Sequence, residues 1–511
     1  MLVLPRNAQP AMRAGRSLAA LAERSGMCAQ RTVRMQHTSA SRRSRSMPWT
    51  AIALAAGGSV AGGLTLALAD TVHAESPAKK TMPAPAPLPT LPDISALDSK
   101  VLDDPNVPMR DRMATYVKLL QRRIVQAISD EEQDGCSDSA DRREHGDLAT
   151  KRPKSFVVES WTRKEGGEGI SCVIQDGKVF EKGGVNVSVV YGNLPPSAIR
   201  QMSPDHDELI HRTGYKIEGP DAEVDGLPFF ATGISLVIHP RNPYAPTSHA
   251  NFRYFELGHP EKLKNGEPNP RYNPKEPITW WFGGGADLTP MYLYPEDAQH
   301  FHKELKRAAD AHDPAFYAAW KPWCDHYFRI AHRDESRGVG GLFFDDIKLP
   351  VWSRSKQSFI PLYDGTPKND RQLVSSKPHS SETLFQAVRS IGDAFVPAYV
   401  PLVHRRKNTP YDDQNEIWKQ LRRGRYAEFN LVYDRGTKFG LFTPSARIES
   451  IMMSLPLHAR WEYMQGNSGT GRWGSVAAAN SLQDCLKECS KEETAAREEI
   501  QDALERPREW V

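Results

Sequence analysis

The 511-residue sequence predicts an α+β fold in which one large, mostly antiparallel β-sheet is covered by α-helices. The first observation behind this prediction is a series of strand-like segments from residue 155 to residue 257, with no helical pattern between them. Consecutive strands without helices favour an antiparallel sheet. The second is that helical patterns precede and follow this series. The composition, 39% hydrophobic and 25% charged, is ordinary for a soluble globular protein and allows a large core.

The strand predictions rest on alternation between apolar and polar residues. The segment Val185–Tyr191 is the clearest case, because its valines alternate with Asn186 and Ser188, which is typical of a half-buried strand. The expected strands are Ser155–Thr162, Ile170–Gln175, Val185–Tyr191, Phe229–Ile238, Ser248–Leu257, Ile278–Phe282, Leu342–Phe344, Tyr426–Tyr433 and Phe439–Phe442. The glycine run 283–285 is expected to end the strand that begins at Ile278.

Helices are predicted where apolar residues recur every three to four positions. In Pro108–Ser129 the apolar residues form one stripe, and Pro108 stands where a first helical turn tolerates proline. The other expected helices are Pro295–Asp310, Pro314–Arg333, Glu382–His404, Asp412–Arg423 and Ser481–Leu504. We expect Pro397 and Pro401 to interrupt the helical stretch Glu382–His404. We expect one domain over residues 106–511, with surface insertions near 353–381 and 466–479.

Residues 1–74 differ in composition from the rest of the chain. They contain nine arginines, no lysine, and only Glu23 and Asp70 as acidic residues. This pattern is typical of a mitochondrial presequence, and a basic nucleic-acid-binding arm is the alternative. The apolar segment 47–69 is long enough to span a bilayer and predicts sorting to the mitochondrial intermembrane space. Cleavage near residues 72–74 and retention as a membrane anchor both stay open.

The charge of the chain depends on this first segment. Removal of residues 1–74 takes away a net charge of +7, so that the formal charge changes from +3 to about −4. The basic character therefore belongs to the presequence, and no nucleic-acid partner is predicted for the remainder. Peripheral association with the inner mitochondrial membrane is a further expectation. A Pro-rich linker, residues 75–105, separates the presequence from the domain.

Polar residues gather on two of the expected strands, before and after the Pro-rich turn 240–247. Because side chains alternate along a strand, His249, Asn251 and Arg253 share one face. The turn can make the two strands neighbours, which adds Ser235 and His239 to the same face. Such groups are costly to bury without partners, so we expect them to meet a wet cavity or an anionic ligand. An exposed outer face is the alternative.

Charged residues near turns indicate the type of ligand. Arg253, Arg333, Arg337 and Arg447 each occur beside turn or strand-end residues. Guanidinium groups bind carboxylates through two parallel hydrogen bonds, so converging arginines would suit a ligand with several carboxylates. Ion pairs with local acidic residues are the alternative. Asp287 follows the glycine run and could accept hydrogen bonds from N–H donors of a ligand, or it could be a simple turn aspartate.

Histidines and cysteines give no metal pattern. His239, His249, His302 and His332 lie on different expected elements, without the short pair spacing of zinc sites. We interpret them as proton donors or hydrogen-bonding groups in a polar cavity, and we predict no metal. The six cysteines contain no C-x-x-C pair, and the glycine run does not match a dinucleotide fingerprint.

Four long motifs, in the same order, resemble the oxygen-dependent coproporphyrinogen-III oxidase family. They are NPYAPTSHANFRYFE (Asn242–Glu256), WWFGGGADLTP (Trp280–Pro290), FRIAHRDESRGVGGLFFDD (Phe328–Asp346) and the run from Leu421 to Tyr463. The likeness spans roughly residues 108–511, including the RPREWV at 506–511.

The resemblance implies a single domain with a large antiparallel sheet sandwiched between α-helices. Members of this family convert the ring A and ring B propionates of coproporphyrinogen III into vinyl groups by oxidative decarboxylation, a step of haem biosynthesis. The products are protoporphyrinogen IX, carbon dioxide and hydrogen peroxide. Dioxygen is the co-substrate, no organic cofactor is used, and the eukaryotic members are metal-independent homodimers. We therefore expect coproporphyrinogen III as the substrate and a homodimer as the assembly.

Site residues follow from the same resemblance. It implies that His249 is a proton donor and that Asp287 holds the pyrrole N–H groups. The implied substrate-contacting residues are Ser235, Asn251, Phe252, Arg253, His332, Arg333, Arg337, Ser445, Ala446 and Arg447. The family usually has Gly-Ser where Ser445-Ala446 stands, which changes the backbone approach and the hydroxyl contact there. Bacterial relatives with a divalent metal on histidines matching the four above give a minority alternative.

The chemistry of the expected substrate agrees with these residues. Its four propionates account for the arginines, and its four pyrrole N–H donors account for a carboxylate that only accepts. Our mechanistic hypothesis is that Asp287 stabilises the pyrrole as it loses a proton, His249 transfers a proton to the peroxide, and Arg253 holds the reacting propionate. Two other classes remain as alternatives: a non-catalytic tetrapyrrole carrier, and a histidine–metal hydrolase that chelators would inhibit.

Overall fold

The computed structural model describes most of the domain that the sequence predicts. The described residues are 99–134, 153–347 apart from 165, 198, 200–213 and 218, then 351–353, 358–360, 371–373, 379–442, 447–462 and 491–511. The predicted presequence, its apolar segment 47–69, most of the linker and the insertion at 466–479 lie outside them. Among the described helices, none has the length and apolar character needed to cross a bilayer.

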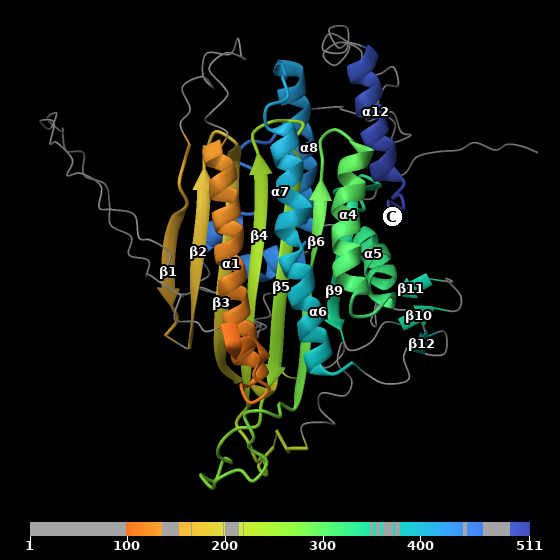
Figure 1. The fold of residues 1–511 in the computed structure, drawn as a ribbon. Helices are drawn as coiled ribbons and strands as arrows, with labels where there is room; N and C mark the ends of the chain where they lie inside the picture. The colour runs from red at the N-terminus through yellow and green to blue at the C-terminus, as the bar shows by residue number, and fades with distance from the viewer. Residues whose placement is uncertain are drawn as a thin grey trace, which may run out of the picture. The chain divides into compact units, whose positions relative to one another are not determined.

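The centre of the fold is a seven-stranded sheet in the order β1-β2-β3-β4-β5-β6-β9 (Figure 1). Every neighbouring pair is antiparallel, as the sequence predicts. The strands are β1 (Val157–Thr162), β2 (Gly167–Gln175), β3 (Phe180–Leu194), β4 (Leu227–Pro240), β5 (Thr247–Leu257), β6 (Thr279–Thr289) and β9 (Gly340–Ile347). Two small sheets accompany it: β7 (Arg329–Ile330) with β8 (Glu335–Ser336), and β11 (Ser358–Ile360), β10 (Val351–Ser353) and β12 (Arg371–Leu373). The last three strands lie in the predicted insertion at 353–381 or beside it.

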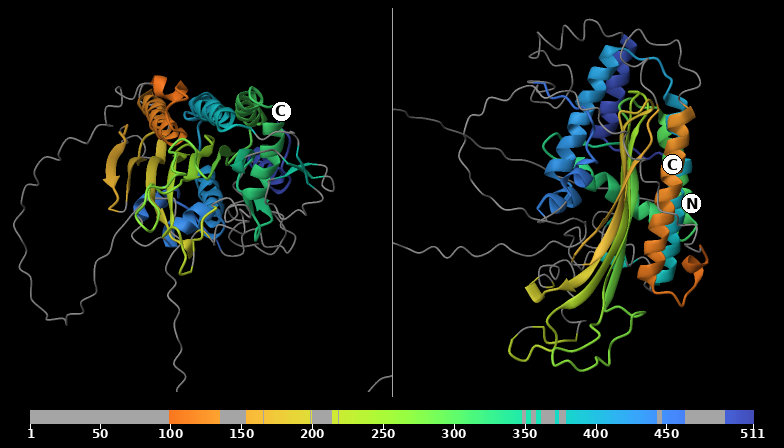
Figure 2. Two further views of the ribbon diagram at one scale, coloured as in Figure 1. Left: turned by 90° about the horizontal axis from the view of Figure 1, so that it is seen from below. Right: turned by 90° about the vertical axis from the view of Figure 1, so that its left-hand side faces the viewer.

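Helices cover both faces of the main sheet (Figure 2). They are η1 (Ser99–Asp103), α1 (Met109–Asp134), α4 (Pro295–Asp310), α5 (Ala315–Tyr327), α6 (Ser381–Asp393), α7 (Phe395–Arg406), α8 (Asp413–Val432), α9 (Arg435–Phe442), α10 (Ile448–Met452) and α12 (Lys491–Glu505). Helices α1, α4, α6 and α7 lie on one face, and α8 lies on the other (Figures 1 and 2). The α+β prediction, with a sheet between helices, is confirmed.

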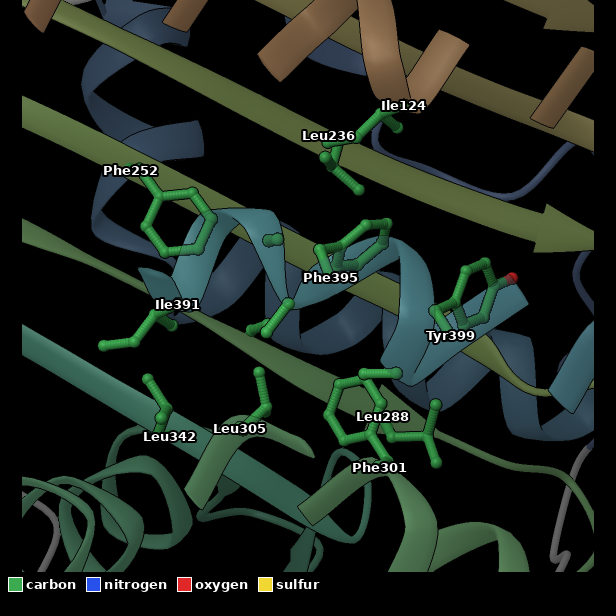
Figure 3. Close-up of a cluster of buried hydrophobic side chains, with 14 of the residues drawn as sticks. Ile124, Leu236, Phe252, Leu288, Phe301, Leu305, Leu342, Ile391, Phe395 and Tyr399 are labelled. Atoms are coloured by element: carbon green, nitrogen blue, oxygen red, sulfur yellow. The ribbon is translucent and has the colours of Figure 1, made fainter. Parts of the chain in front are cut away.

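The face toward α1, α4, α6 and α7 holds the main hydrophobic core (Figure 3). Leu236 of β4, Phe252 of β5 and Leu288 of β6 point from the strands toward helix residues such as Ile391 and Phe395. All five are almost fully buried. Burying one such side chain stabilises the fold by about 1.5–3 kcal/mol, so this face supplies much of the free energy of folding.

Two predicted strands are wrong. Residues 426–433 continue helix α8, which ends at Val432, and residues 439–442 belong to helix α9. The aromatic residues Tyr426 and Phe429 misled the strand prediction, but their spacing of three residues suits one buried helix face. Helix α8 starts with a capping box between Asp412 and Asn415 and is stabilised by packing against the sheet, which single-residue propensity does not register.

The glycine run ends no strand, contrary to the prediction, because β6 continues through it to Thr289. Gly284 has φ of +156°, and a Cβ there would lie 2.4 Å from the Asn251 carbonyl oxygen. A side chain on Gly285 would similarly collide with the Leu342 carbonyl oxygen of β9. The glycines therefore let β6 approach its two neighbours, β5 and the edge strand β9, closely, and they act inside the sheet.

Two helix boundaries also differ from the predictions. The helix expected at Pro314–Arg333 ends at Tyr327, where the chain enters the short hairpin β7–β8. The helical stretch expected at Glu382–His404 is interrupted at Ala394, between α6 and α7, and not at Pro397 or Pro401, which both lie within α7. Of the helix expected at Ser481–Leu504, the described part is α12 from Lys491, and residues 481–490 lie outside the described ranges.

Candidate active site

The strand register gathers the predicted polar residues on the face of the sheet opposite the hydrophobic core. The opposed residues are Val237, His249, Asp287 and Gly341 in one row, Asn186, Ser235, Asn251 and Gly285 in the next, and Gly233, Arg253 and Gly283 in a third. Cross-strand partners point to the same face of a sheet. We call this set the polar sheet face. Its pairing places Asp287 beside His249, although 38 residues separate them.

A buried charge cluster occupies the centre of the polar sheet face. Asp287 is 2% exposed, and its Oδ1 accepts a 2.7 Å hydrogen bond from Nδ1 of His249. The guanidinium of Arg337 donates from Nη2 to both Asp287 oxygens at 2.8 Å. Asn251 lies 3.3 Å from Nε2 of His249 through its side-chain nitrogen. With Nδ1 held by Asp287, Nε2 is the ring atom of His249 that is left to take up or release a proton.

The cluster keeps its charges despite its burial. Burial alone would raise the pKa of Asp287, but the Arg337 guanidinium and the His249 hydrogen bond outweigh it and lower that pKa. Burial would likewise lower the pKa of Arg337, and the adjacent Asp287 carboxylate raises it instead. The buried aspartate is therefore an ionised, acceptor-only group over the range in which proteins usually work.

Aromatic rings hold the Arg337 side chain in place. Its guanidinium carbon lies 4.1 Å from the ring centre of Phe328, 4.7 Å from that of Tyr426 and 4.9 Å from that of Phe429. Nη1 donates to Asn430 at 3.0 Å. Tyr426, Phe429 and Asn430 all come from helix α8, so the segment mistaken for a strand is what positions this arginine.

Arg253 lies at the more exposed end of the polar sheet face. It donates to Asn251 at 3.2 Å and forms an ion pair with Asp345 of β9. Arg435 of α9 also binds Asp345, at 2.7 Å. Burial would raise the pKa of Asp345, but these two guanidiniums lower it. A side chain at Gly283 would lie 2.8 Å from Nε of Arg253, so the glycine leaves room for the arginine.

The structure separates Phe252 from the other predicted site residues. Its side chain points to the apolar face and is fully buried in the hydrophobic core (Figure 3). Ser235, by contrast, is exposed on the polar sheet face. Asn186 of β3 stands opposite Ser235 and donates to the Ser450 carbonyl oxygen at 3.1 Å. The sequence showed that Asn186 alternates with valines along its strand, but only the strand register shows that Asn186 joins the polar sheet face.

His332 and Arg333 form a second, more exposed cluster with a residue that the sequence analysis missed. His332 lies 2.7 Å from the Tyr433 hydroxyl through Nδ1 and 2.6 Å from Glu428 through Nε2. Arg333 binds both oxygens of Glu428, at 2.9 and 2.7 Å. Burial would raise the pKa of Glu428, but these partners lower it to about 2. Arg333 is therefore paired, though not with the nearby acids Asp334 and Glu335.

Arg447 lies toward the β1 edge of the sheet, away from the Asp287 cluster. It precedes α10 and forms an ion pair with Glu159 of β1. Ser445 and Ala446 lie outside the described residues. All four arginines singled out in the sequence thus have carboxylate partners, and each partner is distant in sequence. Local ion pairing, the alternative considered above, does not account for them.

The four histidines of the minority metal reading have separate partners. His239 contacts Thr247 and the Ser454 carbonyl, and His302 contacts Tyr317 and the Val339 carbonyl. Burial lowers the pKa of both rings to about 3, so both are neutral. The group of metal-ligand type found among the described residues is a different one: Glu131, Asp134 and His404. The ammonium of Lys407 pairs with both of those carboxylates.

The arrangement can bind and react with an anionic, N–H-bearing ligand. An ionised carboxylate is available as a hydrogen-bond acceptor, and an imidazole nitrogen next to it can move a proton. The Arg253–Asp345–Arg435 group carries a net charge of +1, which suits one further carboxylate. The residues that the sequence analysis missed are acidic or amide partners that become visible only through pairing: Asn186, Asp345, Glu428 and Asn430.

Comparison with known proteins gives a consistent result. A family model described as "Coproporphyrinogen III oxidase" matches residues 112–479. The chain is 46% identical over 367 residues to the oxygen-dependent coproporphyrinogen-III oxidase of Drosophila melanogaster, which covers 72% of this chain and 75% of that protein. It is 46% identical over 356 residues to the mitochondrial enzyme of Rattus norvegicus, covering 70% of this chain and 63% of that protein. It is also 45% identical over 342 residues to the chloroplastic coproporphyrinogen-III oxidase 1 of Arabidopsis thaliana, covering 67% of this chain and 73% of that protein.

Proposed function

The chain belongs to the coproporphyrinogen III oxidase family, and on this premise we propose that it catalyses the oxygen-dependent oxidative decarboxylation of coproporphyrinogen III. The ring A and ring B propionates become vinyl groups, and protoporphyrinogen IX, carbon dioxide and hydrogen peroxide are formed. The observation that carries the proposal is the Asp287–Arg337–His249 cluster beside Arg253 on one polar sheet face. The chain matches just under two thirds of the length of the rat relative.

The balance of the reaction defines what the protein must supply. Each propionate carboxylate becomes a vinyl group and carbon dioxide, and it gives up two electrons with one hydrogen to dioxygen. Dioxygen must then take up one further proton to leave as hydrogen peroxide. The reduced, electron-rich macrocycle provides the electrons, so the proposal includes no organic cofactor and no metal. The protein must bind the carboxylates, hold the pyrrole N–H groups and move protons.

The buried aspartate is suited to holding the pyrrole N–H groups. Asp287 Oδ1 already accepts from His249 and Arg337, whereas Oδ2 accepts one hydrogen bond from the described residues, that of Arg337. A carboxylate has about four lone-pair positions, so Oδ2 retains acceptor capacity for a pyrrole N–H. Because Arg337 and His249 already fix the carboxylate in place, it can hold a pyrrole N–H as that group loses its proton, without reorganising at the moment of reaction.

Proton transfer and substrate orientation fall to the neighbours of Asp287. We assign proton transfer to the reduced oxygen to Nε2 of His249. Nδ1 donates to the carboxylate and Nε2 accepts from Asn251, so Nε2 first takes up a proton from solvent and then gives it to the reduced oxygen. Arg253 holds the reacting propionate, and its partners Asn251 and Asp345 fix its position. His332, Arg333 and Arg447 lie farther out and would bind the remaining propionates.

We also propose a location and an assembly. Mammalian relatives are named mitochondrial, and the Arg-rich, acid-poor residues 1–74 have the composition of a mitochondrial presequence. The apolar segment 47–69 supports the intermembrane space as the compartment, with peripheral contact to the inner membrane. A homodimer is the assembly that the family resemblance implies.

An oxygen-dependence assay tests the proposed function. Purified protein is incubated with coproporphyrinogen III in air, under nitrogen, and in air with a chelator, and the porphyrins are measured by fluorescence after oxidation. We expect protoporphyrin and hydrogen peroxide in air only, with no effect of the chelator. Binding without turnover in air would indicate the tetrapyrrole carrier instead. Loss of turnover with the chelator would contradict the metal-independent mechanism.

A further inference from the structure

The segment that contains Arg337 is held from two sides by one region, residues Lys491–Val511, which we call the α12 brace. On one side, Gln501 of α12 donates to Glu335 at 2.7 Å. On the other, the indole N–H of Trp510 donates to the Val339 carbonyl at 3.2 Å. Arg337 lies midway between these two contacts. Both brace residues are buried and come from a part of the chain far from Arg337 in sequence.

The Val339 carbonyl receives a second donor from helix α4, the ring of His302, which lies beside that of Trp510. His302 of α4 is fully buried, and its Nε2 lies 3.1 Å from this oxygen. Because a carbonyl can only accept, Nε2 carries the proton, and Nδ1 accepts from the Tyr317 hydroxyl at 2.7 Å. A carbonyl oxygen has two lone pairs, so Trp510 and His302 together satisfy it. This leaves the Val339 peptide little freedom to turn.

The same peptide is tied to the strand that contains Asp287. The Val339 amide donates to the Leu288 carbonyl at 2.9 Å. A Cβ on Gly338 would lie 2.1 Å from that carbonyl oxygen, so the backbone is pressed against β6. Any displacement of Val339 therefore changes the distance between the Arg337 guanidinium and the Asp287 carboxylate.

A buried lysine fixes the brace itself. Lys321 of α5 donates to the Arg508 carbonyl at 2.7 Å and pairs with Asp325 at 2.7 Å. It is 2% exposed, so these contacts are shielded from water. Residues 506–511 are thereby attached to α5, and Trp510 is presented to the Val339 peptide.

We propose that Trp510 and Gln501 are positioning residues of the reaction: they hold Arg337 against Asp287 without touching the substrate. This inference rests on the proposed function for its kinetic consequence. Misplacing a charged group by a fraction of an ångström weakens catalysis while leaving substrate affinity largely unchanged, because the substrate does not contact the brace. A brace that served only global stability would change the unfolding temperature and not the kinetics.

Replacement of the indole donor tests this proposal. Trp510→Phe keeps a ring in the space but removes the N–H. We expect kcat to fall by about fivefold, in line with the loss of one buried hydrogen bond, with KM within about twofold of the wild-type value. A looser Arg337 also lets the pKa of Asp287 rise, so the acid limb of the pH–rate profile should move to higher pH. Gln501→Met should act in the same direction.

Tyr399→Phe is the matched control. It removes one buried donor, the Tyr399 hydroxyl that binds the Pro246 carbonyl at 3.0 Å, on the apolar side of the sheet (Figure 3). We expect it to lower the unfolding temperature and leave kcat and the pH profile unchanged. If Trp510→Phe lowers only the unfolding temperature, as the control does, the proposal is overturned.

Two further measurements keep the test decisive. His302→Gln retains a donor to the Val339 carbonyl and should preserve kcat, whereas His302→Leu should lower it, so this pair serves if Trp510→Phe fails to fold. Hydrogen exchange of peptides covering residues 337–342 should become faster in Trp510→Phe and stay unchanged in Tyr399→Phe. The hydrogen-exchange measurement does not depend on turnover. An inactive wild-type protein would contradict the proposed function, whereas unchanged hydrogen exchange in Trp510→Phe would contradict the positioning role of the α12 brace.

Discussion

The two faces of the central sheet are built from alternate residues of the same strands, yet one face is stabilised by apolar burial and the other by pairing of charges. On one face, residues such as Phe252 and Leu236 are buried against helices and need only shape and apolar surface. On the other face, Asp287 and Arg337 are equally buried but carry full charges. The polar sheet face is stable only because each charge there has a partner.

This difference teaches that burial alone does not identify a core residue. Phe252 and Asp287 are both nearly inaccessible to water, and they lie on adjacent strands. A buried apolar side chain adds stability in proportion to its area, whereas a buried ion pair adds little and depends on both partners. Buried ion pairs also occur elsewhere in the molecule, as between Arg423 and Glu181, so the feature that points to a functional site is the pair together with the adjacent His249 imidazole. Three sets of substitutions sharpen the comparison, in order of decreasing effect.

Removal of the central carboxylate should have the largest effect. Asp287→Ala leaves Arg337 buried without its main partner, which costs about 3–5 kcal/mol of stability, and turnover should fall by at least about 10²-fold. Steady-state kinetics and thermal unfolding check both expectations. The double variant Asp287→Ala/Arg337→Met removes both charges and should recover stability but not activity. A folded Asp287→Ala protein with wild-type turnover would refute the assigned role.

Neighbouring residues of β5 should give opposite results. Phe252→Ala creates a cavity in the hydrophobic core and should lower the free energy of unfolding by about 3–5 kcal/mol. Asn251→Ala removes the contacts to His249 and Arg253 on the polar sheet face, and should change stability by less than about 1 kcal/mol while lowering activity. Denaturant unfolding and kinetics of both variants measure this. Similar stability losses in the two would show that the faces do not differ as described.

A conservative change at the exposed end of the polar sheet face should have the smallest effect. Arg253→Lys keeps the positive charge but loses the planar fork, so KM for coproporphyrinogen III should rise by less than about tenfold. Arg405→Lys is the matched control, because both arginine side chains are 39% exposed and paired with an aspartate, but Arg405 lies on α7. An equal rise of KM in both variants would exclude a specific role for Arg253.

The sequence predicted the sheet better than the segments around it. Alternation identified the strands β1 to β5 because their two faces differ so strongly in polarity. It failed at residues 426–433, where aromatic residues favoured a strand while packing of α8 on the sheet decided for a helix. It also failed at the glycine run, because a close approach between strands looks the same as a turn in a single sequence.

By itself, the sequence determined the parity that places His249, Asn251 and Arg253 on one face, and its motifs determined the family. Only the tertiary structure decided that Asp287 pairs with His249 and Arg337 and that Asp345 holds Arg253. The physical reason is the separation along the sequence of the residues that interact. Side-chain alternation is a property of neighbouring residues, whereas strand register and buried ion pairs join residues that are tens to hundreds of positions apart and form only when the whole sheet is assembled.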